Sequence, residues 1–108
     1  TVMPHKPGHC MVIPKMSVDR FYDLDEELYH QVMATAKTMA QIVQAVYQPK
    51  RVGLQIEGLA VPHAHVHLIP INDIGDMDHD RAQKVSPAEL KIQADRLRAM
   101  IKQRSAFA

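Results

Sequence analysis

Three histidines alternate with apolar residues in one short stretch of this 108-residue chain. The stretch reads His63-Ala-His-Val-His-Leu-Ile-Pro-Ile71. In a β-strand, residues two positions apart point to the same face of the sheet. The alternation therefore predicts a strand over residues 63–71, with its histidines on one face and Ala64, Val66 and Leu68 on the other. We expect the apolar face to pack under a helix and the histidine face to line a cleft.

Two further segments predict strands that would join this one in an antiparallel sheet. An apolar run at residues 9–14, bounded by Gly8 and Pro14, is typical of a buried strand. Residues 51–57 alternate polar and apolar side chains, which indicates a half-buried strand. Only the short link at residues 58–62 separates it from the histidine strand, so we expect these two strands to be hairpin neighbours.

Two helices complete the predicted α+β fold. Apolar residues recur at steps of three and four over residues 25–47, which predicts one long helix with Asp23 as its cap. The sequence Ser86-Pro-Ala-Glu89 is typical of a helix start and predicts a C-terminal helix over residues 87–103. The polar and acidic residues 72–85 are expected to form a loop.

The composition indicates a single domain, residues 1–108. Hydrophobic residues make up 46%, charged residues 23%, and the formal net charge is +1, so neither a nucleic-acid polymer nor a membrane is expected as a partner. The chain has one cysteine, Cys10, no CxxC motif and no signal peptide, which favours a cytoplasmic location. With so few strands, we expect two copies to pair as a homodimer.

Three kinds of site could use three imidazoles on one face. A purely structural cluster is unfavourable, since each imidazole needs a polar partner and neighbouring imidazoles oppose one another's protonation. Zinc could bind two of these histidines together with His9 or Glu57. All three could hardly bind one ion, because the outer pair is about 13 Å apart along a strand, at ~3.3 Å per residue. Zn–N bonds are only about 2.0–2.1 Å long. Nucleophilic attack on phosphorus uses all three, as attacking nitrogen, phosphate ligand and proton carrier.

Two motifs carry a resemblance to a known family. The stretch Pro62-His-Ala-His-Val-His-Leu-Ile-Pro70 resembles the signature of the histidine triad (HIT) superfamily, His-φ-His-φ-His-φ-φ, in which φ is apolar. The upstream stretch Pro7-Gly-His-Cys-Met-Val-Ile-Pro-Lys15 resembles that family's Gly-His-x-Leu-Val-Ile-Pro-Lys strand. The resemblance covers about residues 7–71, and it implies a HIT-like fold whose N-terminal strands are lacking in this chain. We name His63, His65 and His67 the triad.

The resemblance also implies an activity and a role for each histidine. Family members are nucleotide hydrolases or transferases that attack the α-phosphorus of nucleoside phosphoramidates or dinucleoside polyphosphates through a covalent nucleotidyl-histidine intermediate. It implies that His65 is the nucleophile and that His67 contacts phosphate oxygens. It implies that His63 orients His65 and joins a hydrogen-bonded relay with His9. It further implies a homodimer, a small-molecule nucleotide substrate, hydrolysis rather than transfer, and no metal or other cofactor.

The segment just before the triad departs from the family pattern. Gly58 is kept, and we expect Gly58, Leu59 and Ala60 to bind nucleotide or phosphate, but Leu59 and Ala60 replace the family's Gln and its Ser or Thr. The loss of those polar side chains leaves substrate choice open. A nucleotide-binding regulatory module with weak or no catalysis is therefore the alternative function, followed by a His-ligated zinc hydrolase.

Overall fold

Three antiparallel strands form a sheet with the histidine strand at its centre. The computed structural model describes residues 6–78, 80 and 82–106. In it, β1 spans Cys10–Val12, β2 spans Arg51–Gln55 and β3 spans Val66–Ile71. β3 pairs with β1 on one side and with β2 on the other, which confirms the predicted hairpin. All three strands are shorter than predicted.

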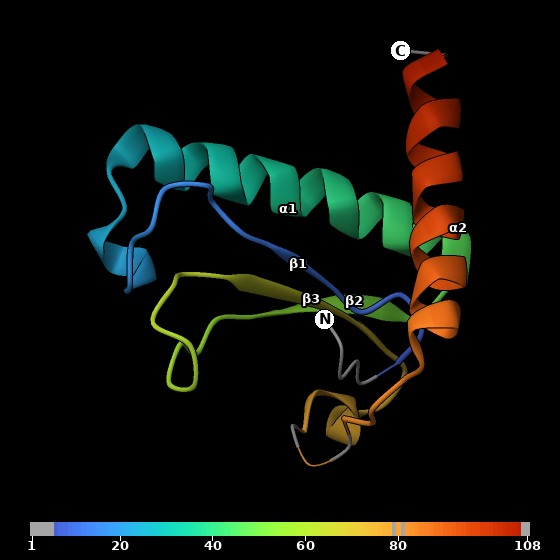
Figure 1. Cartoon of the computed structure of the whole chain (residues 1–108). Coiled ribbons are helices and arrows are strands. Elements are labelled where there is room, and N and C mark those ends of the chain that lie inside the picture. Colours follow the sequence, from blue (N-terminus) through green and yellow to red (C-terminus); the bar gives the residue numbers. More distant parts are fainter. Residues whose placement is uncertain (1–5, 79, 81, 107–108) are drawn as a thin grey trace.

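The long helix α1, Glu26–Tyr47, covers one face of this sheet (Figure 1). Its residues Val32 and Ala36 form one buried cluster with Val66 and Leu68 of β3. The apolar face of the histidine strand therefore packs under α1, as the alternation predicted. Successive strand residues point to opposite faces, so His67, the triad residue within β3, lies on the face turned away from α1.

The ends of α1 have clear local causes. The predicted bounds are confirmed but the predicted cap is wrong, because Asp25 is the N-cap and accepts a 2.8 Å hydrogen bond from the backbone N–H of Leu28. Asp23 instead ends a separate 3₁₀ helix, η1, Phe21–Asp23. At the other end Gln48 takes the left-handed conformation, φ 51°, and a proline follows, so the helix cannot continue.

The C-terminal helix α2, Pro87–Ala106, lies across the C-terminal end of α1 (Figure 1). It begins as predicted, since the Ser86 hydroxyl accepts a 3.2 Å hydrogen bond from the backbone N–H of Glu89, and it runs three residues beyond the predicted end. Leu97 buries its side chain in a second cluster with Val43 of α1. Among the residues that the structure describes, no helix is both long and apolar enough to cross a membrane.

The predicted loop after β3 contains a short 3₁₀ helix, η2, Ile74–Met77, so that part of the prediction is wrong. The Asp76 carboxylate, only 1% exposed, nucleates it by accepting hydrogen bonds from the backbone N–H groups of Asn72, at 2.7 Å, and Asp73, at 3.1 Å. Lys6 Nζ lies 3.3 Å from the same carboxylate. The hydrogen bond from the Asn72 N–H is the largest cause that lowers the pKa of Asp76 to about 2. Burial opposes this shift, and the Asp73 N–H and Lys6 add to it.

A tight turn precedes β1 and packs against α1. The His9 backbone N–H donates to the carbonyl oxygen of Lys6 at 3.0 Å, with Pro7 and Gly8 as the two central residues. Gly8 has φ +93°, so proline and glycine stand where a type II turn favours them. A Cβ atom on Gly8 would lie 2.6 Å from the Tyr47 ring. Only glycine fits this turn without displacing the ring.

We predict that Gly8→Ala lowers the free energy of unfolding by about 3 kcal/mol. About 1 kcal/mol comes from a positive φ in a non-glycine residue and about 2 kcal/mol from the overlap with Tyr47. Gly58→Ala is the matched control, because Gly58 has φ +78° but no atom within 4 Å of an added Cβ, and we expect it to cost about 1 kcal/mol. Urea unfolding followed by circular dichroism measures both, and equal losses would contradict the ring contact.

We also predict that acid destabilises the protein partly through Asp76. The folded-state pKa lies below the ordinary value of 3.8, so this carboxylate stabilises the fold above pH 3.8 and the stabilisation disappears as the pH falls toward 2. In urea titrations, Asp76→Asn should therefore be less stable than wild type near pH 6, and the difference should shrink between pH 3.8 and about 2. A difference that stays constant over that range would show that the charge contributes nothing.

Candidate active site

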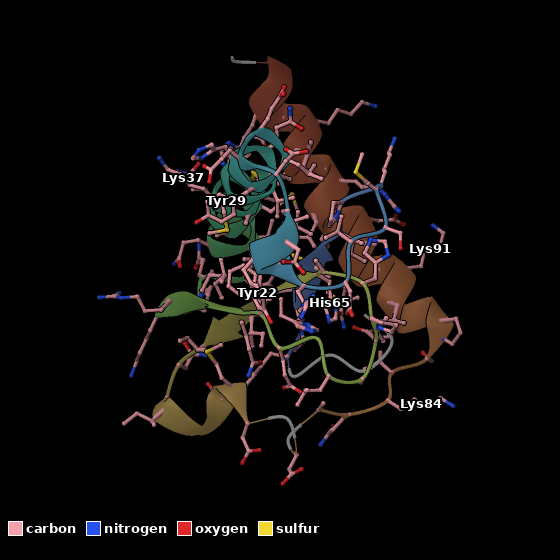
Figure 2. All side chains as sticks on the ribbon, turned by 90° about the vertical axis from the view of Figure 1, so that its left-hand side faces the viewer. Tyr22, Tyr29, Lys37, His65, Lys84 and Lys91 are labelled. Carbon is pink, nitrogen blue, oxygen red and sulfur yellow. The ribbon has the colours of Figure 1, made fainter. Side chains whose placement is uncertain are left out.

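The triad lies at the end of the sheet where the β2–β3 connection meets the segment that leads to η1. The backbone N–H of Ala64 donates to the carbonyl oxygen of Val18 at 2.7 Å, which ties the triad segment to that neighbour. This bond also explains why β3 begins later than predicted, since the backbone there pairs outside the sheet. Figure 2 views the molecule from this end, with His65 and Tyr22 of η1 near its centre.

The His65 ring is held by the backbone of its own segment. His65 Nδ1 lies 2.7 Å from the carbonyl oxygen of His63. A carbonyl oxygen only accepts hydrogen bonds, so Nδ1 must carry the proton. In the neutral imidazole, Nε2 then keeps its lone pair, which is the requirement for a nucleophile or a base.

The His63 ring is held by the end of β1. His63 Nε2 lies 2.9 Å from the carbonyl oxygen of Pro14, so the proton of the neutral ring is on Nε2. His63 therefore orients His65 through its main-chain oxygen, while its own ring is fixed to the chain that follows β1. The two neighbouring histidines thus have opposite tautomers.

The third triad ring contacts the upstream histidine. His67 Nδ1 lies 3.0 Å from His9 Nε2, and the two ring centroids are 5.1 Å apart. His9 therefore pairs with His67, and its implied relay with His63 stays a prediction. Strand register is the reason: Met11 lies opposite His67, so His9, two residues away on the same face, is diagonal to it.

The His9–His67 bond limits how much charge the pair can hold. One nitrogen must donate and the other must accept, so both rings cannot be fully protonated while the bond persists. The His65 ring packs edge-on against His67, with centroids 4.8 Å apart. The three rings consequently form one contiguous polar surface.

Comparison with known proteins identifies the family. The model of the HIT domain matches residues 1–74, well over half of the chain. The chain belongs to the HIT domain family. That match and the structural neighbours confirm the predicted α+β fold, with its antiparallel sheet, long helix and C-terminal helix.

Solved HIT structures superpose on most of the chain. A HIT-like protein involved in cell-cycle regulation from Bartonella henselae is 26% identical, with a TM-score of 0.76, covering 93% of this chain and 76% of that one. A Zn-bound histidine triad family protein from Mycobacterium smegmatis is 19% identical, with a TM-score of 0.78, covering 100% and 78%. The second comparison supports the fold alone.

Relatives with named activities match a smaller part of this chain than the solved structures do. A bis(5'-nucleosyl)-tetraphosphatase of Schizosaccharomyces pombe is 32% identical over 72 residues, which are 62% of this chain and 40% of that protein. A bis(5'-adenosyl)-triphosphatase of Dictyostelium discoideum is 31% identical over 72 residues, 62% of this chain and 48% of that protein. This HIT chain thus spans less than half the length of either relative.

The HIT segment before the triad is an exposed apolar loop. Gly58 has φ +78°, and the Leu59 side chain is 88% exposed, with Ala60 also exposed. The loop turns directly into the triad, since the His63 N–H donates to the carbonyl oxygen of Val61 at 2.8 Å. Leu59 and Ala60 can offer phosphate only backbone N–H groups. Their role in binding stays a prediction.

The ligand set considered for zinc does not come together in the part of the chain that the structure describes. There, no three His, Cys, Asp or Glu side chains are close enough to share a metal ion. His9 bonds to His67, while Glu57 is exposed beside the β2–β3 loop.

Two contributors to this site were not predicted from the sequence. They are the backbone carbonyls of Pro14 and Val18, which accept hydrogen bonds from the His63 ring and from the Ala64 N–H. Every residue has a carbonyl group, so no residue type could have pointed to them. Only the fold shows which carbonyls reach the triad.

We predict the tautomers of two triad histidines. Long-range ¹H–¹⁵N spectra of the neutral protein should show His65 protonated at Nδ1 and His63 protonated at Nε2, because each faces a carbonyl oxygen. His30, whose side chain on α1 is 71% exposed and lies 3.4 Å from the exposed Glu26 carboxylate, serves as the internal reference for a surface imidazole. An Nε2-protonated His65 would contradict the assignment and remove its free lone pair.

Proposed function

We propose that this chain hydrolyses nucleoside 5′-phosphate derivatives at the α-phosphorus, with His65 Nε2 as the nucleophile. The observation that carries the proposal is the 2.7 Å contact of His65 Nδ1 with the carbonyl oxygen of His63, which leaves the Nε2 lone pair free. The names of the curated relatives, a bis(5'-nucleosyl)-tetraphosphatase and a bis(5'-adenosyl)-triphosphatase, support the substrate class.

The reaction proceeds in two displacements. The Nε2 lone pair of His65 forms a bond to phosphorus as the bond from phosphorus to the leaving group breaks, and the leaving group departs with that electron pair. Water then attacks the nucleotidyl-histidine, gives a nucleoside monophosphate, and returns the electron pair to Nε2. The second step releases a proton, which the neighbouring imidazoles can accept.

His67 binds the phosphate oxygens in this proposal. Its Nδ1 lies 3.0 Å from His9 Nε2. In this proposal the His67 ring donates a hydrogen bond to a phosphate oxygen. A cationic pair would stabilise the negative charge that develops on those oxygens most strongly. Because the two imidazoles can share one proton, His9 supports His67 in both its neutral and its charged form.

The substrate has an apolar surface beside it. Exposed Leu59 and Ala60 carry no polar side-chain atoms, so the proposed contacts there are to backbone N–H groups or to apolar parts of the ligand. The proposal includes both dinucleoside polyphosphates and nucleoside phosphoramidates. A cytoplasmic homodimer that needs no cofactor is part of the same proposal. Edge strand β2, with exposed Leu54, is one surface on which a second copy could pair.

The same loop favours one alternative, a nucleotide-binding module with weak or no catalysis. Calorimetric binding of AMP without turnover of a phosphoramidate or a dinucleotide would support it, since binding needs only the phosphate contacts. Turnover of either substrate at least about a thousandfold above that of the His65→Ala variant would exclude it.

We predict that His65→Ala lowers the rate of diadenosine tetraphosphate hydrolysis by at least about a thousandfold, because it removes the attacking nitrogen. Wild-type protein mixed with α-³²P-labelled nucleotide and quenched in alkali should retain label, and the variant should not. His30→Ala is the control, a distant and exposed histidine that should keep full activity.

Two results would contradict this mechanism. Turnover that survives in His65→Ala, with no label on the wild-type protein, would remove His65 as nucleophile. Activity that is lost on chelation and restored by zinc would favour the zinc hydrolase instead.

A further inference from the structure

We propose that Lys6 and Asp76 are positioning residues for His9, and through His9 for His67 of the triad. This role follows from the contacts of Lys6 with the Asp76 carboxylate and with the His9 backbone, which lie outside the triad. Its catalytic consequence rests on the proposed function, which makes His67 a phosphate ligand.

The first link is the fixed position of the Asp76 carboxylate. It is 1% exposed and accepts hydrogen bonds from Asn72 N–H at 2.7 Å and Asp73 N–H at 3.1 Å, directly after β3 ends. These two hydrogen bonds hold the carboxylate at the end of the central strand, and neither of them involves Lys6.

The second link joins this carboxylate to the turn before β1. Lys6 Nζ lies 3.3 Å from Asp76 Oδ1, and the Lys6 carbonyl oxygen accepts the His9 backbone N–H at 3.0 Å. One residue thus contacts the loop after β3 with its side chain and the upstream histidine with its main chain. The ion pair holds one end of the Lys6–His9 turn against the end of the central strand.

The third link is the weak support that β1 itself gives to His9. β1 spans only Cys10–Val12, and its register partners in β3 are Leu68, His67 and Val66. His9 lies just outside this ladder, so the sheet does not fix its backbone directly. The residue is nevertheless only 6% exposed, and its Nε2 lies 3.0 Å from His67 Nδ1. The Lys6–His9 turn adds a constraint on the His9 backbone through the 3.0 Å hydrogen bond to the Lys6 carbonyl oxygen, and Gly8 of the same turn donates a 3.4 Å hydrogen bond to Gln93 Oε1.

The ion pair is not needed to fold η2. Asp73 caps that 3₁₀ helix by accepting a 3.1 Å hydrogen bond from Gly75 N–H, and the Asp76 carboxylate already accepts two backbone hydrogen bonds there. Removing the Lys6 ammonium therefore leaves η2 with its own hydrogen bonds. A change in the His9–His67 pair in such a variant reports positioning rather than loss of the loop.

The test compares Lys6→Met and Asp76→Asn with two controls. Lys6→Arg keeps the positive charge, and Asp78→Asn removes a carboxylate from the same loop while leaving an oxygen to accept the Asp80 N–H. Long-range ¹H–¹⁵N spectra measure the bond between the His9 and His67 rings. Steady-state kinetics on diadenosine tetraphosphate measure kcat and KM separately.

We expect Lys6→Met and Asp76→Asn to lose the hydrogen-bonded imidazole signal and to lower kcat by about tenfold, with KM changed less than about twofold. Lys6→Arg and Asp78→Asn should behave like wild type. Should Asp76→Asn fail to fold, Lys6→Met decides alone, since η2 keeps its cap.

An unchanged imidazole signal in Lys6→Met would overturn the proposal, and so would equal losses in Lys6→Met and Lys6→Arg. If wild type hydrolyses no nucleotide, the proposed function fails. The imidazole signal still decides whether Lys6 and Asp76 position His9, because it requires no turnover.

Discussion

The strict alternation of side chains along residues 63–68 is the constraint on which the rest of this structure depends. One face carries Ala64, Val66 and Leu68 into the interior, where α1 covers the last two, and the other face carries the triad. A shift of register by one residue would place three imidazoles under α1. Burying a polar group without a partner costs about 1–3 kcal/mol, so a single register is strongly favoured.

The chemistry of the site follows from which groups face each imidazole. His63 and His65 each face a carbonyl oxygen, which fixes their protons at Nε2 and Nδ1. His67 faces another imidazole, so its proton position is shared. Two rings that donate to carbonyl oxygens therefore lie beside one that is hydrogen-bonded to another imidazole. The proposed function uses the lone pair of His65 for attack on phosphorus and the His9–His67 pair beside the phosphate oxygens.

Much of the fold was predictable because it depends on local periodicity. The bounds of α1, the β2–β3 hairpin and the start of α2 follow from side-chain patterns that a helix or a strand imposes over many residues. The cap of α1 was mispredicted because Asp23 and Asp25 are equally good caps by residue type. η2 was missed, although Asp73 and Asp76 have the spacing of a capping box.

The contacts within the site were less predictable. Residue types placed His9 beside the triad, but strand register brings its ring to His67. The roles of the carbonyl oxygens of Pro14 and Val18 likewise depend on where the chain passes after β1. Such contacts join segments far apart in sequence, and side-chain patterns within one segment contain no information about them.

The His9–His67 contact also bears on how the protein folds. Its two residues are 58 positions apart in the chain, and the whole of α1 lies between them. Closing so long a loop costs conformational entropy that local structure cannot offset, so contacts of this kind tend to form after the local elements. A partly folded chain with α1 and the β2–β3 hairpin in place would still lack the imidazole pair. Appearance of the pair during refolding is therefore a probe of the completed tertiary structure.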